Sequence, residues 1–174
     1  RECCVDGCSP TLGGGGVILD VSHEINYLNW LVGNICEVKG YFETLSDLEV
    51  TSDDISVFLC RFDNNAIGQV HLDMIQHENT RNCKIIGTTG TLEFDFITGT
   101  LRFFTQASKK WESIKYHVNF DEVYRNELRA FVNNCMGNKD KLISGRVGKV
   151  TMDVIEAVRR SHQFGTAIRL PLYN

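Results

Sequence analysis

The residues best suited to chemistry lie together in one predicted helix over residues 17–32. Asp20 and His23 stand about one helical turn apart, so a carboxylate can orient an imidazole that moves a proton. Tyr27 and Trp30 lie on the same face of the predicted helix, where they could form the bottom of a pocket for a sugar ring. Two structural alternatives remain open. In the first, Asp20 only serves an exposed helix surface and His23 is a solvated or packed histidine. In the second, the aromatic rings only pack against a neighbouring element.

A run of four glycines over residues 13–16 precedes this helix. Glycine lets a backbone or a ligand come close to the helix start, where free N–H groups favour anionic or electron-rich groups. The run is neither the Gly-x-Gly-x-x-Gly fingerprint after a strand nor a P-loop, because no Gly-Lys-Ser/Thr follows it. The sequence therefore predicts a pocket wall here and not a dinucleotide site.

The elements that must position these residues follow from hydrophobic periodicity. Apolar residues recur at helical spacing along 17–32, and Gly33 is expected to end that helix. Further helices are predicted over 121–136 and 144–164, each followed by glycine. The apolar stripe of the first helix consists of Val17, Val21, Ile25, Leu28 and Val32.

Between the helices the pattern changes to period two, which predicts an antiparallel meander with short turns. Within residues 66–76, Val70 and Leu72 point to one face while Gln69 and His71 point to the other. We therefore expect an α+β fold: an open, mostly antiparallel sheet with helices packed on one face, and a second face free for a partner. Strands are predicted over 37–44, 55–62, 66–76, 82–87, 91–96, 100–105, 111–117 and 167–170.

Length and composition predict a single domain over residues 14–174 after a loose N-terminal segment, residues 1–13. The chain has 174 residues, 43% of them hydrophobic, which suits one well-buried core. The formal net charge is -4 and the 18 Lys and Arg residues are scattered, so neither nucleic acid nor a membrane surface is an expected partner. No apolar run is long enough to span a bilayer and no signal peptide is recognised, so the expected location is cytoplasmic.

The seven cysteines are expected to be reduced, because they show no Cys-x-x-Cys pair or zinc knuckle. Cys3, Cys4 and Cys8 could in principle grip a metal, but flexible thiols are the favoured interpretation. The histidines outside the first helix lie in different predicted elements, so no metal site is expected, and a metal-dependent hydrolase ranks far behind other functions.

Several motifs in order resemble the Gfo/Idh/MocA oxidoreductase family. The resemblance begins with Gly-Gly-Gly-Val-Ile-Leu-Asp-Val-Ser-His-Glu-Ile-Asn-Tyr-Leu over 14–28 and covers nearly the whole chain from Gly14. Here the Asp and His are three residues apart, where many members have four, and Asn26 stands where an Asp is common. The later matching segments are 70–76, 83–95, 124–132 and 145–170.

The resemblance implies a C-terminal domain that normally follows a Rossmann domain. In the family, that Rossmann half binds NAD or NADP and supplies a catalytic lysine, so this chain alone is expected to bind no cofactor and to be inactive. The family's substrate-contacting Asp and His correspond to Asp20 and His23, with His23 as the acid/base. Asn26, Tyr27 and Trp30 are the expected substrate-binding residues, and the open sheet face is expected to form a homo-oligomer.

Two functions of different classes follow from the sequence. The first is the substrate-binding and oligomerisation half of an NAD(P)-dependent dehydrogenase that acts on a sugar, a sugar derivative or a cyclitol, with the missing Rossmann domain as its partner. The second is a stand-alone, non-catalytic domain that binds a ligand or a partner through its open sheet. An upstream reading frame with a glycine fingerprint and a catalytic lysine would favour the first.

Overall fold

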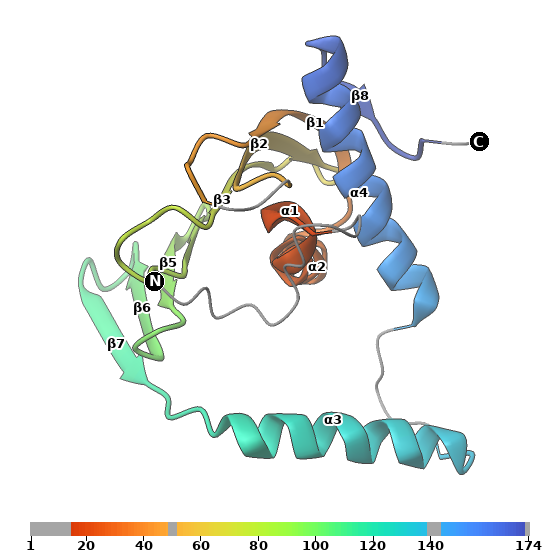
Figure 1. The fold of residues 1–174 in the computed structure, drawn as a ribbon. Coiled ribbons are helices and arrows are strands. Elements are labelled where there is room, and N and C mark those ends of the chain that lie inside the picture. The colour runs from red at the N-terminus through yellow and green to blue at the C-terminus, as the bar shows by residue number, and fades with distance from the viewer. Residues whose placement is uncertain (1–14, 49–51, 139–143, 173–174) are drawn as a thin grey trace. The chain divides into compact units, whose positions relative to one another are not determined.

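The computed structural model describes residues 15–48, 52–138 and 144–172, which form two compact units. The first unit comprises residues 1–75 and 143–174, and the second comprises residues 76–142 (Figure 1). The loose segment expected over 1–13, with Cys3, Cys4 and Cys8, lies outside the described residues. That residues 14–174 form a single domain stays a prediction.

The first unit is built on a four-stranded antiparallel sheet with the order β3-β2-β1-β8. The register places Gly40 of β1 opposite Phe58 of β2, and Phe58 opposite Val70 of β3. Alternation is strict along β3: Val70 and Leu72 are buried, while Gln69 and His71 are exposed, as predicted. The strands are β1 (Ile35–Glu43), β2 (Ile55–Phe62), β3 (Ile67–Asp73) and β8 (Ile168–Arg169).

Three helices supply the other side of this unit's core: α1 (Val17–Asp20), α2 (Ser22–Val32) and α4 (Gly145–Phe164) (Figure 1). The helix expected over 17–32 therefore occurs as two segments, because Val21 leaves helical geometry at φ -106° and ψ 29°. Its predicted apolar stripe does face the core: Val17 and Ile25 are buried, and Val21, Leu28 and Val32 pack against the cluster. The side chains that α4 contributes to the core are Val154, Ile155, Ala157 and Val158.

Helix α4 comes close to β1 at Gly40. A Cβ added there would lie 2.3 Å from the Phe58 Cβ and 2.5 Å from the Val57 carbonyl oxygen, so only glycine fits. The Gly40 N–H donates to the buried Ser161 hydroxyl of α4 at 3.1 Å, and that hydroxyl donates to the Thr166 carbonyl at 2.6 Å. One side chain thus joins the sheet, the helix and the segment that leads to β8.

The second unit contains a separate antiparallel meander, with the order β4-β5-β6-β7, followed by α3 (Phe120–Cys135). The α+β class is confirmed, but the strands form two four-stranded sheets where one sheet was expected. Asn119 caps α3 by accepting from the Glu122 N–H at 3.3 Å. The strands are β4 (Asn82–Ile86), β5 (Gly90–Asp95), β6 (Thr100–Thr105) and β7 (Trp111–Lys115).

Two further observations concern the described residues only. None of their helices is both long enough and apolar enough to cross a membrane. The four cysteines among them, which are Cys36, Cys60, Cys83 and Cys135, are free thiols, and the reduced state of all seven stays a prediction. Burial raises the pKa of the Cys60 thiol to about 11.

Candidate functional site

The five predicted site residues line the surface of α1 and α2. Asp20 ends α1 and is exposed, and the His23 side chain in the first turn of α2 is 57% exposed. Trp30 near the end of α2 is 81% exposed, while Tyr27 and Asn26 are half-buried. The helix therefore presents an imidazole, a carboxylate and a large ring on a surface that a substrate can reach.

His23 has a carboxylate neighbour that the sequence analysis did not name. Its Nε2 atom lies 3.1 Å from Oε1 of Glu24, the next residue along α2. A carboxylate at this distance can orient the imidazole. Glu24 is therefore an additional candidate for the role that the sequence interpretation gave to Asp20 alone.

Asn26 is directed toward α4. Its Nδ2 donates to the Thr151 hydroxyl at 3.3 Å, and Thr151 is buried at 6% exposure. This hydrogen bond joins α2 to α4 and engages part of the amide that was expected to contact substrate. The side-chain Oδ1 of Asn26 is the atom through which this residue could accept a hydrogen bond from a ligand.

Sequence reasoning missed the residue that holds the start of this helix, Asp53. Its side chain is 3% exposed, and its Oδ2 accepts from the Ile18 N–H at 3.0 Å. Its carbonyl oxygen accepts from the Val17 N–H at 2.8 Å. A carboxylate at a helix N-terminus satisfies free N–H groups and complements the positive end of the helix dipole. Asp53 therefore fixes where the helix with Asp20 begins.

The last glycine of the run has a structural role at the same place. Gly16 has φ 111°, a value that L side chains rarely adopt, and a Cβ there would lie 2.2 Å from the Asp53 Oδ1. Glycine at this position thus lets the Asp53 carboxylate reach the start of the helix. From the sequence, the glycine run was expected to admit a backbone or a ligand there. Gly15 has only Ser52 nearby, and Gly13 and Gly14 lie outside the described residues.

Two buried acidic residues in succession link this helix start to the rest of the first unit. Asp53 Oδ1 lies 3.9 Å from Nη2 of Arg159 on α4. Asp54 is fully buried and accepts from the N–H groups of Leu45 and Ser46 and from the Ser46 hydroxyl, at 2.5 to 2.9 Å. Burial acts to raise the pKa of Asp54, but these hydrogen bonds outweigh it and hold the pKa below its usual value.

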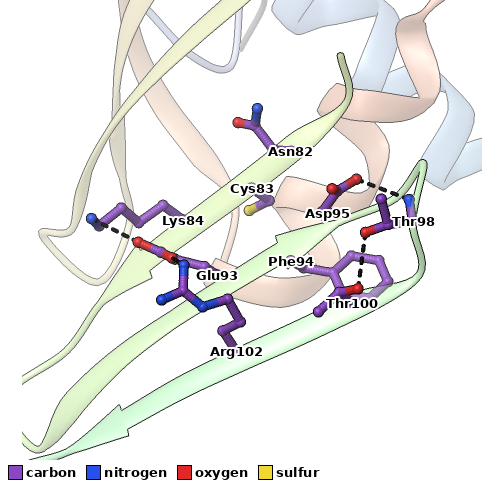
Figure 2. Close-up of a pocket in the computed structure, with 9 residues that line it drawn as sticks. All are labelled: Asn82, Cys83, Lys84, Glu93, Phe94, Asp95, Thr98, Thr100 and Arg102. Atoms are coloured by element: carbon purple, nitrogen blue, oxygen red, sulfur yellow. Dashed lines mark hydrogen bonds and ion pairs between the residues drawn. The ribbon is translucent and has the colours of Figure 1, made fainter. Parts of the chain in front are cut away.

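A depression on the second unit contains none of the predicted site residues. Figure 2 shows it over β4, β5 and β6, where Lys84 and Arg102 both pair with Glu93 at 3.0 and 3.1 Å. Asp95 accepts from the N–H groups of Ile97 and Thr98, which stabilises the turn after β5. Lys84, Arg102 and Glu93 pair with one another, so the depression consists of surface ion pairs and is a weak candidate for a catalytic site.

No group of three or more His, Cys, Asp or Glu side chains is placed to hold a metal ion among the residues that the structure describes. His71 pairs with Asp73 at 2.7 Å on β3, and His162 lies 3.8 Å from Glu43 and against the Phe42 ring. His71 thus has a local hydrogen-bond partner, whereas the buried His162 Nδ1 has none among the described residues.

The chain was compared with a family model, with curated protein sequences and with solved structures. The model of the GFO/IDH/MocA C-terminal domain matches residues 7–93, which is half of the chain. Curated protein sequences give no match. Solved structures do, and the NAD-binding oxidoreductase of Klebsiella pneumoniae overlays with a TM-score of 0.80 at 21% identity, covering 94% of this chain and 53% of its own.

Two other solved relatives are complexes with small molecules. The WlbA dehydrogenase of Bordetella pertussis, bound to NADH and UDP-GlcNAcA, has a TM-score of 0.71 and 24% identity over 91% of this chain and 46% of its own. Levoglucosan dehydrogenase, bound to NADH and levoglucosan, has a TM-score of 0.75 and 19% identity over 87% of this chain and 49% of its own. At these identities the likeness shows the fold, and the chain spans about half the length of the solved relatives.

Proposed function

The chain belongs to the GFO/IDH/MocA family, and from that premise we propose that it is the substrate-binding half of an NAD(P)-dependent oxidoreductase. The proposed substrate is a sugar, a sugar derivative or a cyclitol. The observation that carries the proposal is the exposed polar face of α1 and α2, with His23, its neighbour Glu24 and an aromatic ring at Trp30. Solved relatives with NADH and carbohydrate-derived ligands support it.

In this proposal the residues of the chain serve the substrate side of the reaction. A bound nicotinamide cofactor supplies the hydride acceptor or donor. The His23 imidazole accepts the hydroxyl proton of an alcohol as its carbon is oxidised, or returns that proton in the opposite direction. Glu24, 3.1 Å from the His23 Nε2, orients the imidazole, and the exposed carboxylate of Asp20, three residues before His23, is proposed as the second carboxylate of the site. Tyr27, Asn26 and Trp30 hold the ring of the substrate.

The residues of this chain do not fit the main cofactor site. The glycine nearest the helix, Gly16, is engaged with Asp53, and the sequence has no Gly-x-Gly-x-x-Gly unit after a strand. We therefore propose that NAD or NADP binds to a Rossmann domain, and that this chain alone is inactive.

The test is His23→Ala in a protein that also contains the nucleotide-binding half. We expect kcat to fall about 10²-fold, the usual scale for a lost general acid/base, with unchanged thermal stability because the side chain is exposed. His77→Ala is the matched control, since His77 is an exposed histidine of the second unit. Turnover of His23→Ala at the rate of the control variant would contradict the assignment.

The proposed homo-oligomer uses the open face of the sheet in the first unit. On this face Tyr41, Leu59 and Ile67 are 56 to 70% exposed beside Gln69 and His71. Such a patch is typical of protein–protein interfaces. The double variant Gln69→Lys and His71→Glu should reduce the mass in solution, measured by light scattering, and an unchanged mass would exclude this surface.

The alternative, a non-catalytic domain that binds a ligand or a partner, rests on the same open sheet face. The sequence of the reading frame upstream of Arg1 would distinguish the two functions. A nucleotide-binding fingerprint with a catalytic lysine supports the oxidoreductase. A nearby stop codon supports the binding domain.

A further inference from the structure

Thr151 of α4 carries a buried hydroxyl that contacts a residue of the candidate site. Helices α2 and α4 pack against each other within the first unit (Figure 1), and both contribute fully buried side chains, Ile25 and Val154, to one core cluster. Thr151 is 6% exposed, so water has little access to its hydroxyl. A hydroxyl in this position needs hydrogen-bond partners within the protein.

The hydrogen bonds of Thr151 determine which atom of the Asn26 amide faces it. The Thr151 hydroxyl donates to the Val147 carbonyl oxygen at 3.3 Å, one turn earlier in α4. Because a hydroxyl has a single proton, its oxygen can then only accept from a further neighbour. The Asn26 Nδ2 is that donor, at 3.3 Å. In the opposite orientation of the amide, Oδ1 would face the hydroxyl oxygen and one of the two hydrogen bonds would be lost.

This orientation leaves the Asn26 Oδ1 as an acceptor on the other side of the amide. The atom has no hydrogen-bond partner among the described residues, and it is not fully buried. His23 precedes Asn26 by three residues, a spacing that makes two side chains neighbours on the surface of a helix. The acceptor oxygen therefore belongs to the same helix face as the proposed acid/base.

We propose that Thr151 is a positioning residue, which holds Asn26 so that its Oδ1 accepts a hydrogen bond from a substrate hydroxyl. This proposal rests on the function proposed above. It defines one group of the substrate, a second hydroxyl close to the one that meets His23. An analogue without that hydroxyl leaves the acceptor unpaired, and a carbonyl or ether oxygen in its place faces another acceptor. The subsite therefore favours polyols over their deoxy, keto and ether analogues.

The first test is the NMR signal of the Asn26 side-chain amide in the 174-residue chain, without any ligand. We expect its protons to exchange with water at least about fivefold more slowly than those of Asn65, an exposed asparagine of the same unit. Thr151→Val replaces the hydroxyl by a methyl group of similar size and should raise the exchange rate to that of Asn65. Thr151→Ser keeps the hydroxyl and should keep the slow exchange.

Two further variants serve as controls. Thr44→Val removes another hydroxyl of the first unit, one that donates to the Ser52 carbonyl oxygen at 2.8 Å, and should leave the Asn26 exchange unchanged. Thr151→Ala removes the hydroxyl without a methyl group in its place, so it should act like Thr151→Val even where valine disturbs the packing of α4. Slow Asn26 exchange in both variants would overturn the proposal, and so would wild-type exchange as fast as that of Asn65.

The second test adds D-glucose, myo-inositol or levoglucosan to the same chain at millimolar concentrations. We expect at least one of these probes to shift the Asn26 side-chain signals. Its dissociation constant should rise about tenfold in Thr151→Val and stay close to the wild-type value in Thr151→Ser. The absence of a shift with all three probes would contradict the proposal, as would equal affinities of the wild type and Thr151→Val.

Monodeoxy analogues of the probe that binds identify the hydroxyl that Asn26 accepts. One analogue should bind to the wild type about tenfold more weakly than the parent compound, and this difference should disappear in Thr151→Val. Equal binding of all the analogues to the wild type would refute the proposed subsite. The proposed function fails by a different measurement, the turnover of His23→Ala, so the two failures are distinguishable.

Discussion

Replacing Asp53 by alanine tests whether one buried carboxylate holds the helix of the candidate site. The change removes the acceptor for the Ile18 N–H, a buried hydrogen bond of 3.0 Å. Hydrogen bonds to charged groups contribute about 1.5–3 kcal/mol, and loss of a helix cap costs about 0.5–2 kcal/mol. The ion pair with Arg159 adds little, because it is 3.9 Å long and Arg159 is 37% exposed. We expect a loss of about 2–3 kcal/mol.

The measurement is urea unfolding followed by far-UV circular dichroism. With a slope of about 2 kcal/mol per molar, the expected loss lowers the midpoint by roughly 1 M urea. Asp53→Asn keeps a carbonyl acceptor for the Ile18 N–H and should lose only about half as much. Asp47→Ala is the control, because Asp47 is an exposed acid in the nearby loop and should change stability by less than about 0.5 kcal/mol. An Asp53→Ala midpoint equal to that of the control would refute the reasoning.

Four further outcomes are expected. Gly40→Ala should destabilise the fold by about 3 kcal/mol or more in thermal unfolding, because its Cβ would overlap the Phe58 Cβ at 2.3 Å. Gly148→Ala should stabilise it by up to about 1 kcal/mol, since nothing lies within 4 Å and alanine favours helix. The Asp54 carboxylate, whose pKa is lowered, contributes stability above its unfolded pKa of about 3.9. That contribution is lost as pH falls through the folded pKa, so Asp54→Asn should flatten the acid limb of stability against pH. Cys60 should react with iodoacetamide at pH 8 at least about 100-fold more slowly than the exposed Cys135, because burial raises its pKa to about 11. Equal alkylation rates would contradict the buried position of that thiol.

Most elements of the fold could be predicted from hydrophobic periodicity, because the spacing of apolar residues in an element shows which of its faces is buried. The alternation of Val70 and Leu72 with Gln69 and His71 is an example, and Gly165, at φ 64°, ends α4 where a glycine was expected to end it. Periodicity does not encode which strands pair, so the separation between β3 and β4 was not predicted. The break at Val21 was also missed, because the apolar stripe continues through it.

The candidate site was predictable only where its residues are close in sequence. The spacing of Asp20 and His23 is a local signal, and so is the adjacent Glu24, which was overlooked. Asp53 accepts a hydrogen bond from the Ile18 N–H, 35 positions away in the sequence, and no local sequence pattern predicts a contact over that separation. The available signal was two consecutive acids directly before a predicted buried strand, a place where buried charges need partners.

The discontinuity of the first unit has a consequence for the order in which the chain folds during synthesis. Its sheet strands β1 to β3 leave the ribosome before α4, but Val154, Ile155 and Val158, which complete their core, lie on α4. The second unit is continuous over residues 76–142, so its meander is complete before α4 emerges. The nascent chain therefore leaves the part of the sheet that α4 covers, chiefly β1, exposed until that helix is made, which makes this unit the expected client of chaperones.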